Sequence, residues 1–192
     1  MIKKEMWIAC IGWGSLVWDD TRELPLLSKW KEDGPMLPVE FARESGGRRI
    51  TLVICNNTPR VRTLWAIADA GDVPMARRQL GYREHPTAST QWIEAEIGYW
   101  DRQSQKSHGR ESAAIVAWAE AKGLAGAVWT NLPCGLGSRA QRGIMPTGEA
   151  VVAHLRGLIG KERDDAEEYV RNAPAQIDTP FRKLIAEQLG WG

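Results

Sequence analysis

The apolar residues of this 192-residue chain change their period along the sequence, and this change most constrains the fold. Up to about residue 70, short apolar or alternating runs are separated by glycine-containing turns, a pattern typical of β-strands. We predict strands over residues 7–13 and 61–68, and a hairpin formed by residues 38–43 and 48–55. The hairpin loop, Glu44-Ser45-Gly46-Gly47, has glycines where a positive φ is needed.

Beyond that point, helical and extended patterns alternate. Asp72-Val73-Pro74 is a helix start with Pro74 near the first position, and helix-forming residues continue to Tyr82, before Pro86. The remaining predictions for this part are strands at residues 92–100 and 125–132, a helix at residues 112–122 closed by Gly123, and loops at residues 104–109 and 132–143.

The last third is predicted to be helical. Thr147 is the expected N-cap of one helix, which we expect Gly160 to end. A charged helix follows at residues 161–172, and Thr179-Pro180 begins a third.

These patterns indicate the α+β class. A chain of this length buries one sizeable core, so we expect a single domain over residues 1–192, with residues from about 147 to 192 as a helical extension. Most of the ten tryptophans are expected in the core or at its edge. The extension leaves open a homodimer paired through these helices.

The charge and hydropathy of the chain indicate which kinds of binding partner to expect. A net charge of +1 without a Lys/Arg run gives no reason to expect nucleic acid or an anionic membrane surface. No apolar run approaches the ~20 residues that span a bilayer, and the first residues do not resemble a secretory signal, so we expect a cytoplasmic protein.

The cysteines and histidines point away from metal chemistry. Cys10, Cys55 and Cys134 lie far apart, no two at metal-ligand spacing, and there are three histidines. We therefore expect no metal site and no disulfide framework. Cys10 and Cys55 lie in apolar runs and are expected to be buried.

Gly12-Trp13-Gly14-Ser15-Leu16, directly after the first predicted strand, is the first candidate functional segment. Glycines on both sides of one side chain allow a sharp turn, and successive N–H groups then suit a carboxylate or a developing oxyanion. The structural alternative is an ordinary turn that ends a strand. The segment lacks the third glycine of a dinucleotide fingerprint.

The second candidate is Glu84, in Tyr82-Arg83-Glu84-His85 at the end of the short helix. The alternative is that Glu84 lies at an ordinary helix end exposed to solvent. Because the chain has 24 acidic residues, one glutamate at such a place is not by itself a sign of function.

Taken together, the segments resemble the gamma-glutamylcyclotransferase-like family. Residues 8–18 are similar to that family's opening strand and its Tyr-Gly-Ser-Leu-type loop. Residues 39–43 with 46–53 resemble the following hairpin, and residues 64–68 the next strand. Residues 76–84, Ala-Arg-Arg-Gln-Leu-Gly-Tyr-Arg-Glu, look like the helix that delivers the family's catalytic carboxylate. The resemblance covers roughly residues 6–130.

The resemblance implies a small mixed β-barrel with flanking helices. It also implies release of 5-oxoproline from a small-molecule substrate, a gamma-glutamyl amine or peptide, by a reaction that requires no metal and no cofactor. It assigns the catalytic carboxylate to Glu84 and substrate binding to Gly12, Trp13, Gly14, Ser15 and Leu16. Trp13 stands where the family usually has Tyr, and a Gly-Gly-Tyr-like segment near Pro86 is missing, which argues against glutathione as the substrate.

Two other functions stay open. The first is a non-catalytic module on the same fold that binds a small metabolite or a protein. The second is a thiol enzyme that uses Cys134 with a histidine, although no Cys–His motif supports it.

Overall fold

The computed structural model describes residues 6–21 and 23–192 and combines α-helices with β-sheets. The expected α+β class is confirmed. The strands of the described residues form three open sheets, and none of the three closes into a barrel. The chain divides into two compact units. Unit 1 comprises the described residues of Met1–Gly12, Asp19–Met36 and Arg62–Leu132, and unit 2 comprises Trp13–Trp18, Leu37–Val61 and Pro133–Gly192.

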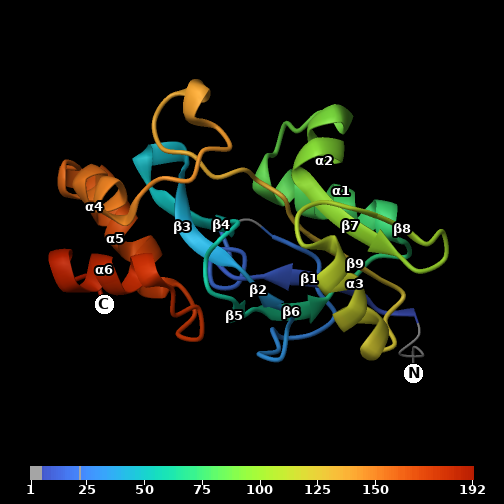
Figure 1. Cartoon of the computed structure of the whole chain (residues 1–192). Helices are drawn as coiled ribbons and strands as arrows, with labels where there is room; N and C mark the ends of the chain where they lie inside the picture. Colours follow the sequence, from blue (N-terminus) through green and yellow to red (C-terminus); the bar gives the residue numbers. More distant parts are fainter. Residues whose placement is uncertain (1–5, 22) are drawn as a thin grey trace. The chain divides into compact units, whose positions relative to one another are not determined.

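Unit 1 is built on a five-stranded sheet with the strand order β6-β1-β9-β7-β8 (Figure 1). Its strands are β1 (Ile8–Gly12), β6 (Leu64–Ile67), β7 (Ile97–Asp101), β8 (Lys106–His108) and β9 (Gly126–Thr130). The strand β1 runs antiparallel to β6 and parallel to β9. All five residues of β1 are buried, as expected for an inner strand covered on both faces.

Three helices pack against this sheet. They are α1 (Val73–Glu84), α2 (Thr90–Glu96) and α3 (Ser112–Ala121). The helix α1 contacts β1, β7 and β9, while α2 contacts β7 and α3 contacts β7, β8 and β9. The core of this unit includes the fully buried Trp100, Trp129 and Ile115.

Unit 2 combines a hairpin with three C-terminal helices (Figure 1). The hairpin is formed by β3 (Val39–Glu44) and β4 (Ile50–Ile54), joined by the 3-10 turn η2 (Gly46–Arg48). The helices are α4 (Gly148–Arg156), α5 (Gly160–Asn172) and α6 (Pro180–Leu189). A second 3-10 turn, η3 (Arg139–Gln141), lies in the predicted loop. The two-residue strands β2 (Met36–Leu37) and β5 (Val61–Arg62) pair with each other, and each has one residue in either unit.

A buried carboxylate joins α6 to the hairpin within unit 2. Glu40 in β3 is fully buried and accepts the hydroxyl hydrogen of Thr179, the N-cap of α6. The amides of Phe41 and Phe181 donate to the same carboxylate, over 2.9 and 3.2 Å. Burial of a carboxyl group is tolerated where several donors satisfy its oxygens, as they do here.

Most sequence-based elements are confirmed. The hairpin, the first strand, the Pro74 helix and the three C-terminal helices lie where they were predicted, within a few residues. Cys10 and Cys55 are buried. Of the ten tryptophans, Trp13, Trp65, Trp100, Trp129 and Trp191 are buried, and the other five are half-buried.

Three predictions of local structure were wrong. The predicted strand over residues 92–100 is a helix in its first half, because the Ser89 hydroxyl accepts from the Trp92 amide and caps α2. The predicted loop over residues 104–109 contains the edge strand β8. Gly160 begins α5 and does not end α4, whose C-cap is Gly157.

Candidate active site

Glu84 lies in the last turn of α1, in unit 1. The helix begins at a cap, where Asp72 Oδ1 accepts from the Met75 amide over 2.7 Å. It ends at His85, whose extended backbone leads into Pro86. These two signals determine which residue stands at the C-terminal end of the helix.

The Glu84 carboxylate takes part in a short series of charges. Arg83 Nη1 lies 3.7 Å from Glu84 Oε1, and Arg83 Nη2 lies 3.7 Å from Asp19 Oδ2. The same Nη2 donates to the main-chain oxygen of Asp19 over 3.2 Å. The side chain of Arg83 is 5% exposed and that of Glu84 is 20% exposed. Glu84 is therefore a mostly buried carboxylate beside a buried guanidinium and not a fully solvated helix end.

The negative charge of Glu84 acts on Cys10, a residue of β1. Burial raises the pKa of the Cys10 thiol far above its usual value, the Glu84 carboxylate raises it further, and Arg83 opposes this. Cys10 lies two residues before Gly12, where β1 ends. Within unit 1, Glu84 therefore lies near the strand that leads into the glycine-containing segment. A thiol with so high a pKa is a poor nucleophile.

The segment after β1 is a compact turn that belongs to unit 2 from Trp13 onward. The amide of Val17 donates to the Gly14 oxygen over 2.9 Å, and the Trp18 amide donates to the Ser15 oxygen over 3.3 Å. Leu16 lies in this turn and is half-buried.

Trp13 is held inside unit 2. It is 3% exposed, and its indole Nε1 donates to the main-chain oxygen of Leu52 in β4 over 3.1 Å. The nearby Gly14 lies against the Tyr169 hydroxyl of α5. The indole N–H is therefore engaged within the fold.

The predicted site residues thus fall into two groups. Gly12 and Glu84 belong to unit 1, whereas Trp13, Gly14, Ser15 and Leu16 belong to unit 2. That Glu84 faces the amides of the turn therefore stays a prediction.

The other sequence candidates have local partners. His85 is exposed, with its ring 5.2 Å from that of Trp92 and its Nδ1 3.3 Å from the Thr87 hydroxyl. Cys134 is half-buried in the loop before η3, and its main-chain oxygen accepts from the Gly143 amide over 2.7 Å.

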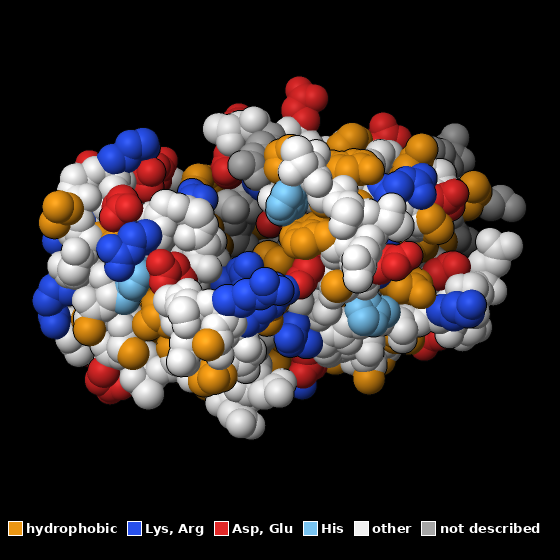
Figure 2. All heavy atoms as spheres, turned by 90° about the horizontal axis from the view of Figure 1, so that it is seen from above, with side chains coloured by type: hydrophobic (Ala, Val, Ile, Leu, Met, Phe, Trp, Pro, Cys, Tyr) orange, Lys and Arg blue, Asp and Glu red, His pale blue; other side chains and the backbone are white. Residues whose placement is uncertain are grey.

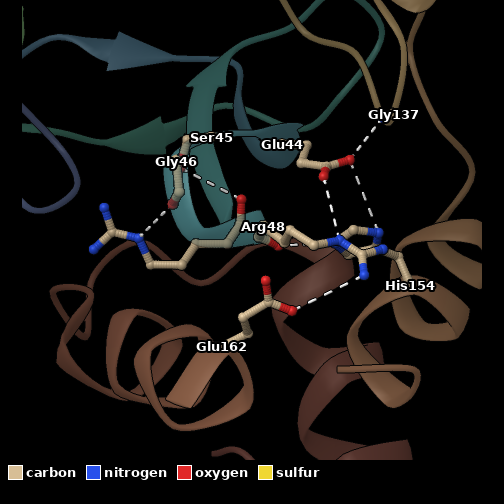
Figure 3. Close-up of polar contacts among 8 residues, drawn as sticks. Glu44, Ser45, Gly46, Arg48, Gly137, His154 and Glu162 are labelled. Atoms are coloured by element: carbon tan, nitrogen blue, oxygen red, sulfur yellow. Dashed lines mark hydrogen bonds and ion pairs between the residues drawn. The ribbon is translucent and has the colours of Figure 1, made fainter. Parts of the chain in front are cut away.

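Sequence reasoning missed a polar cluster in unit 2 (Figure 3). His154 in α4 places Nε2 2.8 Å from the Arg48 main-chain oxygen and Nδ1 3.9 Å from Glu44 Oε2. The same Glu44 oxygen accepts from the Gly137 amide over 2.8 Å. Because both ring nitrogens of His154 face groups of the protein, the cluster joins α4 to the hairpin. His154 and Arg48 are 106 residues apart, and neither carries a local signal of the contact.

Acidic and basic side chains are interspersed with hydrophobic ones on the face of the molecule shown in Figure 2. Within residues 6–21 and 23–192, no three His, Cys, Asp or Glu side chains gather to hold a metal ion. No helix in the same residues combines the length and apolar character needed to cross a bilayer.

Comparison with known proteins returned no match to a family model, a curated protein or a solved structure.

Proposed function

We propose that this chain is a gamma-glutamylcyclotransferase-like enzyme that releases 5-oxoproline from a gamma-glutamyl amine or peptide, with Glu84 as the general base. The observation that carries the proposal is the setting of Glu84. It is a mostly buried carboxylate in the last turn of α1, beside a buried arginine, and its charge reaches β1 close to the glycine-containing turn.

The order of elements supports the same family. The resemblance requires a strand, a glycine turn, a hairpin, a further strand and a helix ending in Arg-Glu. The elements β1, β3–β4, β6 and α1 occur in that order, and α1 ends at Glu84. On this basis we propose that the chain shares the family's order of elements, without a closed barrel among the described residues, and that the C-terminal helices are an addition to it.

The reaction needs little from the protein beyond positioning and proton transfer. The substrate's own α-amine attacks its γ-carbonyl carbon, a C–N bond forms, and the bond to the leaving amine breaks. Glu84 takes a proton from the attacking amine and returns it to the leaving nitrogen. General acid–base help of this kind is worth about 10²–10⁴-fold in rate. Holding the substrate folded adds to this, because the ring closure is intramolecular.

Each group around Glu84 has a role in the proposal. Arg83 is held by Asp19 and in turn positions the Glu84 carboxylate. Main-chain N–H groups in the turn from Gly12 to Leu16 would bind the substrate carboxylate or the tetrahedral oxyanion. One such donor typically contributes ~3 kcal/mol to transition-state stabilisation.

The proposal is tested by a screen of gamma-glutamyl amines and dipeptides for 5-oxoproline release. Glu84→Gln keeps the size of the side chain and removes the base, so turnover should fall by about 10²-fold or more. Glu120→Gln is the matched control, because Glu120 is an exposed carboxylate of α3 in the same unit. Equal turnover by wild type and Glu84→Gln would show that Glu84 is not the base.

A second candidate is a binding module on the same fold that does not turn over its ligand. It is favoured by Trp13, which replaces the family's usual Tyr and uses its only polar hydrogen on Leu52. Calorimetric binding of a gamma-glutamyl amine without release of 5-oxoproline would identify this function.

A further inference from the structure

Unit 1 contains a hollow of about 350 Å³, lined by residues of α1, α2, β7 and β8. This volume lies at the lower end of the range of ~300–1,000 Å³ for small-molecule sites. Every residue that lines it belongs to unit 1, and neither Glu84 nor residues 12–16 are among them. The hollow is therefore independent of the proposed active site.

Arg77 on the wall of this hollow is rigidly held. Its Nε donates to the Ile97 oxygen over 2.9 Å, and one terminal nitrogen donates to the Glu94 main-chain oxygen over 2.7 Å. The guanidinium carbon lies 4.5 Å from the centroid of the Tyr99 ring. A guanidinium fixed on three sides presents its remaining N–H groups in one direction, at little further cost in side-chain entropy.

The positive charge of Arg77 lacks a contacting carboxylate among the described residues, since its hydrogen-bond acceptors are neutral main-chain oxygens. Burial lowers the pKa of Arg77, opposed by Tyr99 and Glu94, so the guanidinium has lost part of its hydration. A partly desolvated cation that no carboxylate contacts directly favours an anionic ligand.

The other charged groups of the hollow limit the charge of that ligand. Three cations line the hollow: Arg77, Arg78 and Lys106. Two carboxylates, Glu94 and Asp101, also line it, so the net charge of the lining is three minus two, or +1. Both Asp101 oxygens already accept hydrogen bonds, from the Gln103 amide and the Ser104 hydroxyl. The balance suits a single negative charge better than a phosphate dianion.

Aromatic and aliphatic side chains line another part of the hollow. Tyr82 is 49% exposed and lines it together with Tyr99, Ile93 and Val73. An exposed aromatic ring beside a fixed guanidinium provides a surface for a planar apolar group and a partner for its carboxylate.

From these observations we propose that the hollow between α1, α2 and β7 binds a small aromatic monocarboxylate, with Arg77 and Arg78 contacting the carboxylate and Tyr82 the ring. This site lies outside the proposed cyclotransferase chemistry, and the two proposals can fail independently.

Isothermal titration calorimetry of the full chain with three probes tests the proposal. The probes are indole-3-acetate, the neutral indole-3-acetamide and the cation tryptamine, which share a ring and differ in charge. We expect indole-3-acetate to bind with a Kd of ~1 mM or lower, and the other two at least about tenfold more weakly. Failure of indole-3-acetate to bind at ~10 mM, or equal binding of all three probes, would overturn the proposal.

Two charge variants with opposite expected effects separate binding from folding. Arg78→Gln removes an exposed cation and should weaken indole-3-acetate binding about tenfold. Glu94→Gln removes a repelling carboxylate and should tighten it. Lys29→Gln removes an exposed charge elsewhere in unit 1 and should leave it unchanged. Weakening by both Arg78→Gln and Glu94→Gln, or by neither, would overturn the assignment of the carboxylate to this hollow.

Arg77 needs a conservative variant, because its hydrogen bonds also support α2 and β7. Arg77→Lys keeps the charge and loses the planar fork, so binding should weaken while the selectivity for the anion is retained. Loss of that selectivity in a folded Arg77→Lys protein would contradict the role given to its charge.

Discussion

The hydroxyl of Tyr169 lies so close to Gly14 that a Cβ added to this glycine would overlap it. The same hydroxyl accepts from the Leu52 amide over 3.2 Å, and the Tyr169 ring packs edge-on against Trp18 and Phe41. The glycine at this place in the turn is therefore required by packing against α5 within unit 2.

This relationship predicts that Gly14→Ala destabilises the protein by about 1–3 kcal/mol, because the added methyl group overpacks a buried site. Urea unfolding measures the change. Tyr169→Phe removes the overlapping oxygen, so Gly14→Ala should cost less in that background than in the wild type. Equal costs in the two backgrounds would mean that Tyr169 does not restrict Gly14.

The hairpin turn offers a matched test of backbone conformation. Gly47 has φ +68°, whereas Gly46 does not adopt a positive φ, and neither has an atom within 4 Å of an added Cβ. Gly47→Ala should lower the free energy of unfolding by roughly 1–2 kcal/mol, because an L-residue is strained there. Gly46→Ala should be neutral or stabilising by up to about 1 kcal/mol. Equal effects of the two substitutions would contradict the assigned turn geometry.

The raised pKa of the buried Glu40 predicts that the stability of the protein falls as pH rises. Burial raises the pKa of Glu40 above its usual 4.5, while hydrogen bonds from Thr179 and the Phe41 amide work against the rise. The folded protein therefore holds this proton more tightly than the unfolded chain does. Its contribution to stability is complete below about pH 4.5 and is lost as pH rises through the folded pKa.

Urea midpoints measured across this pH range in wild type and Glu40→Gln isolate the effect, since Gln does not titrate. The difference between the two proteins should change with pH in the stated direction. Glu120→Gln, at an exposed carboxylate, should show the wild-type dependence. A difference that stays constant with pH would contradict a raised pKa for Glu40.

The lowered pKa of Asp33, in unit 1, predicts the opposite dependence of stability on pH. Hydrogen bonds from Lys122 and the Trp65 indole, over 2.6 and 2.7 Å, lower the pKa of Asp33. Its contribution to stability is therefore present above the usual value of 3.8 and is lost as pH falls through the folded pKa. The side chain is 61% exposed, so the effect should be small and weaker at high salt.

Acid unfolding followed by tryptophan fluorescence measures this contribution. Asp33→Asn should begin to unfold at a higher pH than wild type, whereas Asp20→Asn, at an exposed aspartate of the same unit, should not. Identical acid transitions for wild type and Asp33→Asn would contradict the role assigned to Asp33.

The elements that sequence analysis predicted well are those with strong local signals. The run that forms β1 is apolar and ends at a glycine, and α1 has both a capping Asp72 and Pro74 in its first turn. At α2 two signals competed. Trp92, Glu94 and Glu96 alternate as in a strand, but the Ser89 cap made this short segment helical up to Glu96.

The contacts around the candidate sites had no such signals. Asp19 and Arg83 are 64 residues apart, and only the folding of unit 1 brings them together. The hollow beside Arg77 is lined from two helices and two strands, including β8, which was predicted as a loop. The identity of Glu84 as a candidate came from the resemblance, because a lone glutamate at a helix end has no distinguishing pattern.

The most direct test of the account is the rate constant kcat for 5-oxoproline release, measured for wild type, Glu84→Gln and Glu120→Gln on the best gamma-glutamyl substrate from the screen. All three proteins must first show the same thermal midpoint. We predict that Glu84→Gln loses about 10²–10⁴-fold in kcat and that Glu120→Gln loses nothing. Full activity in folded Glu84→Gln would contradict it.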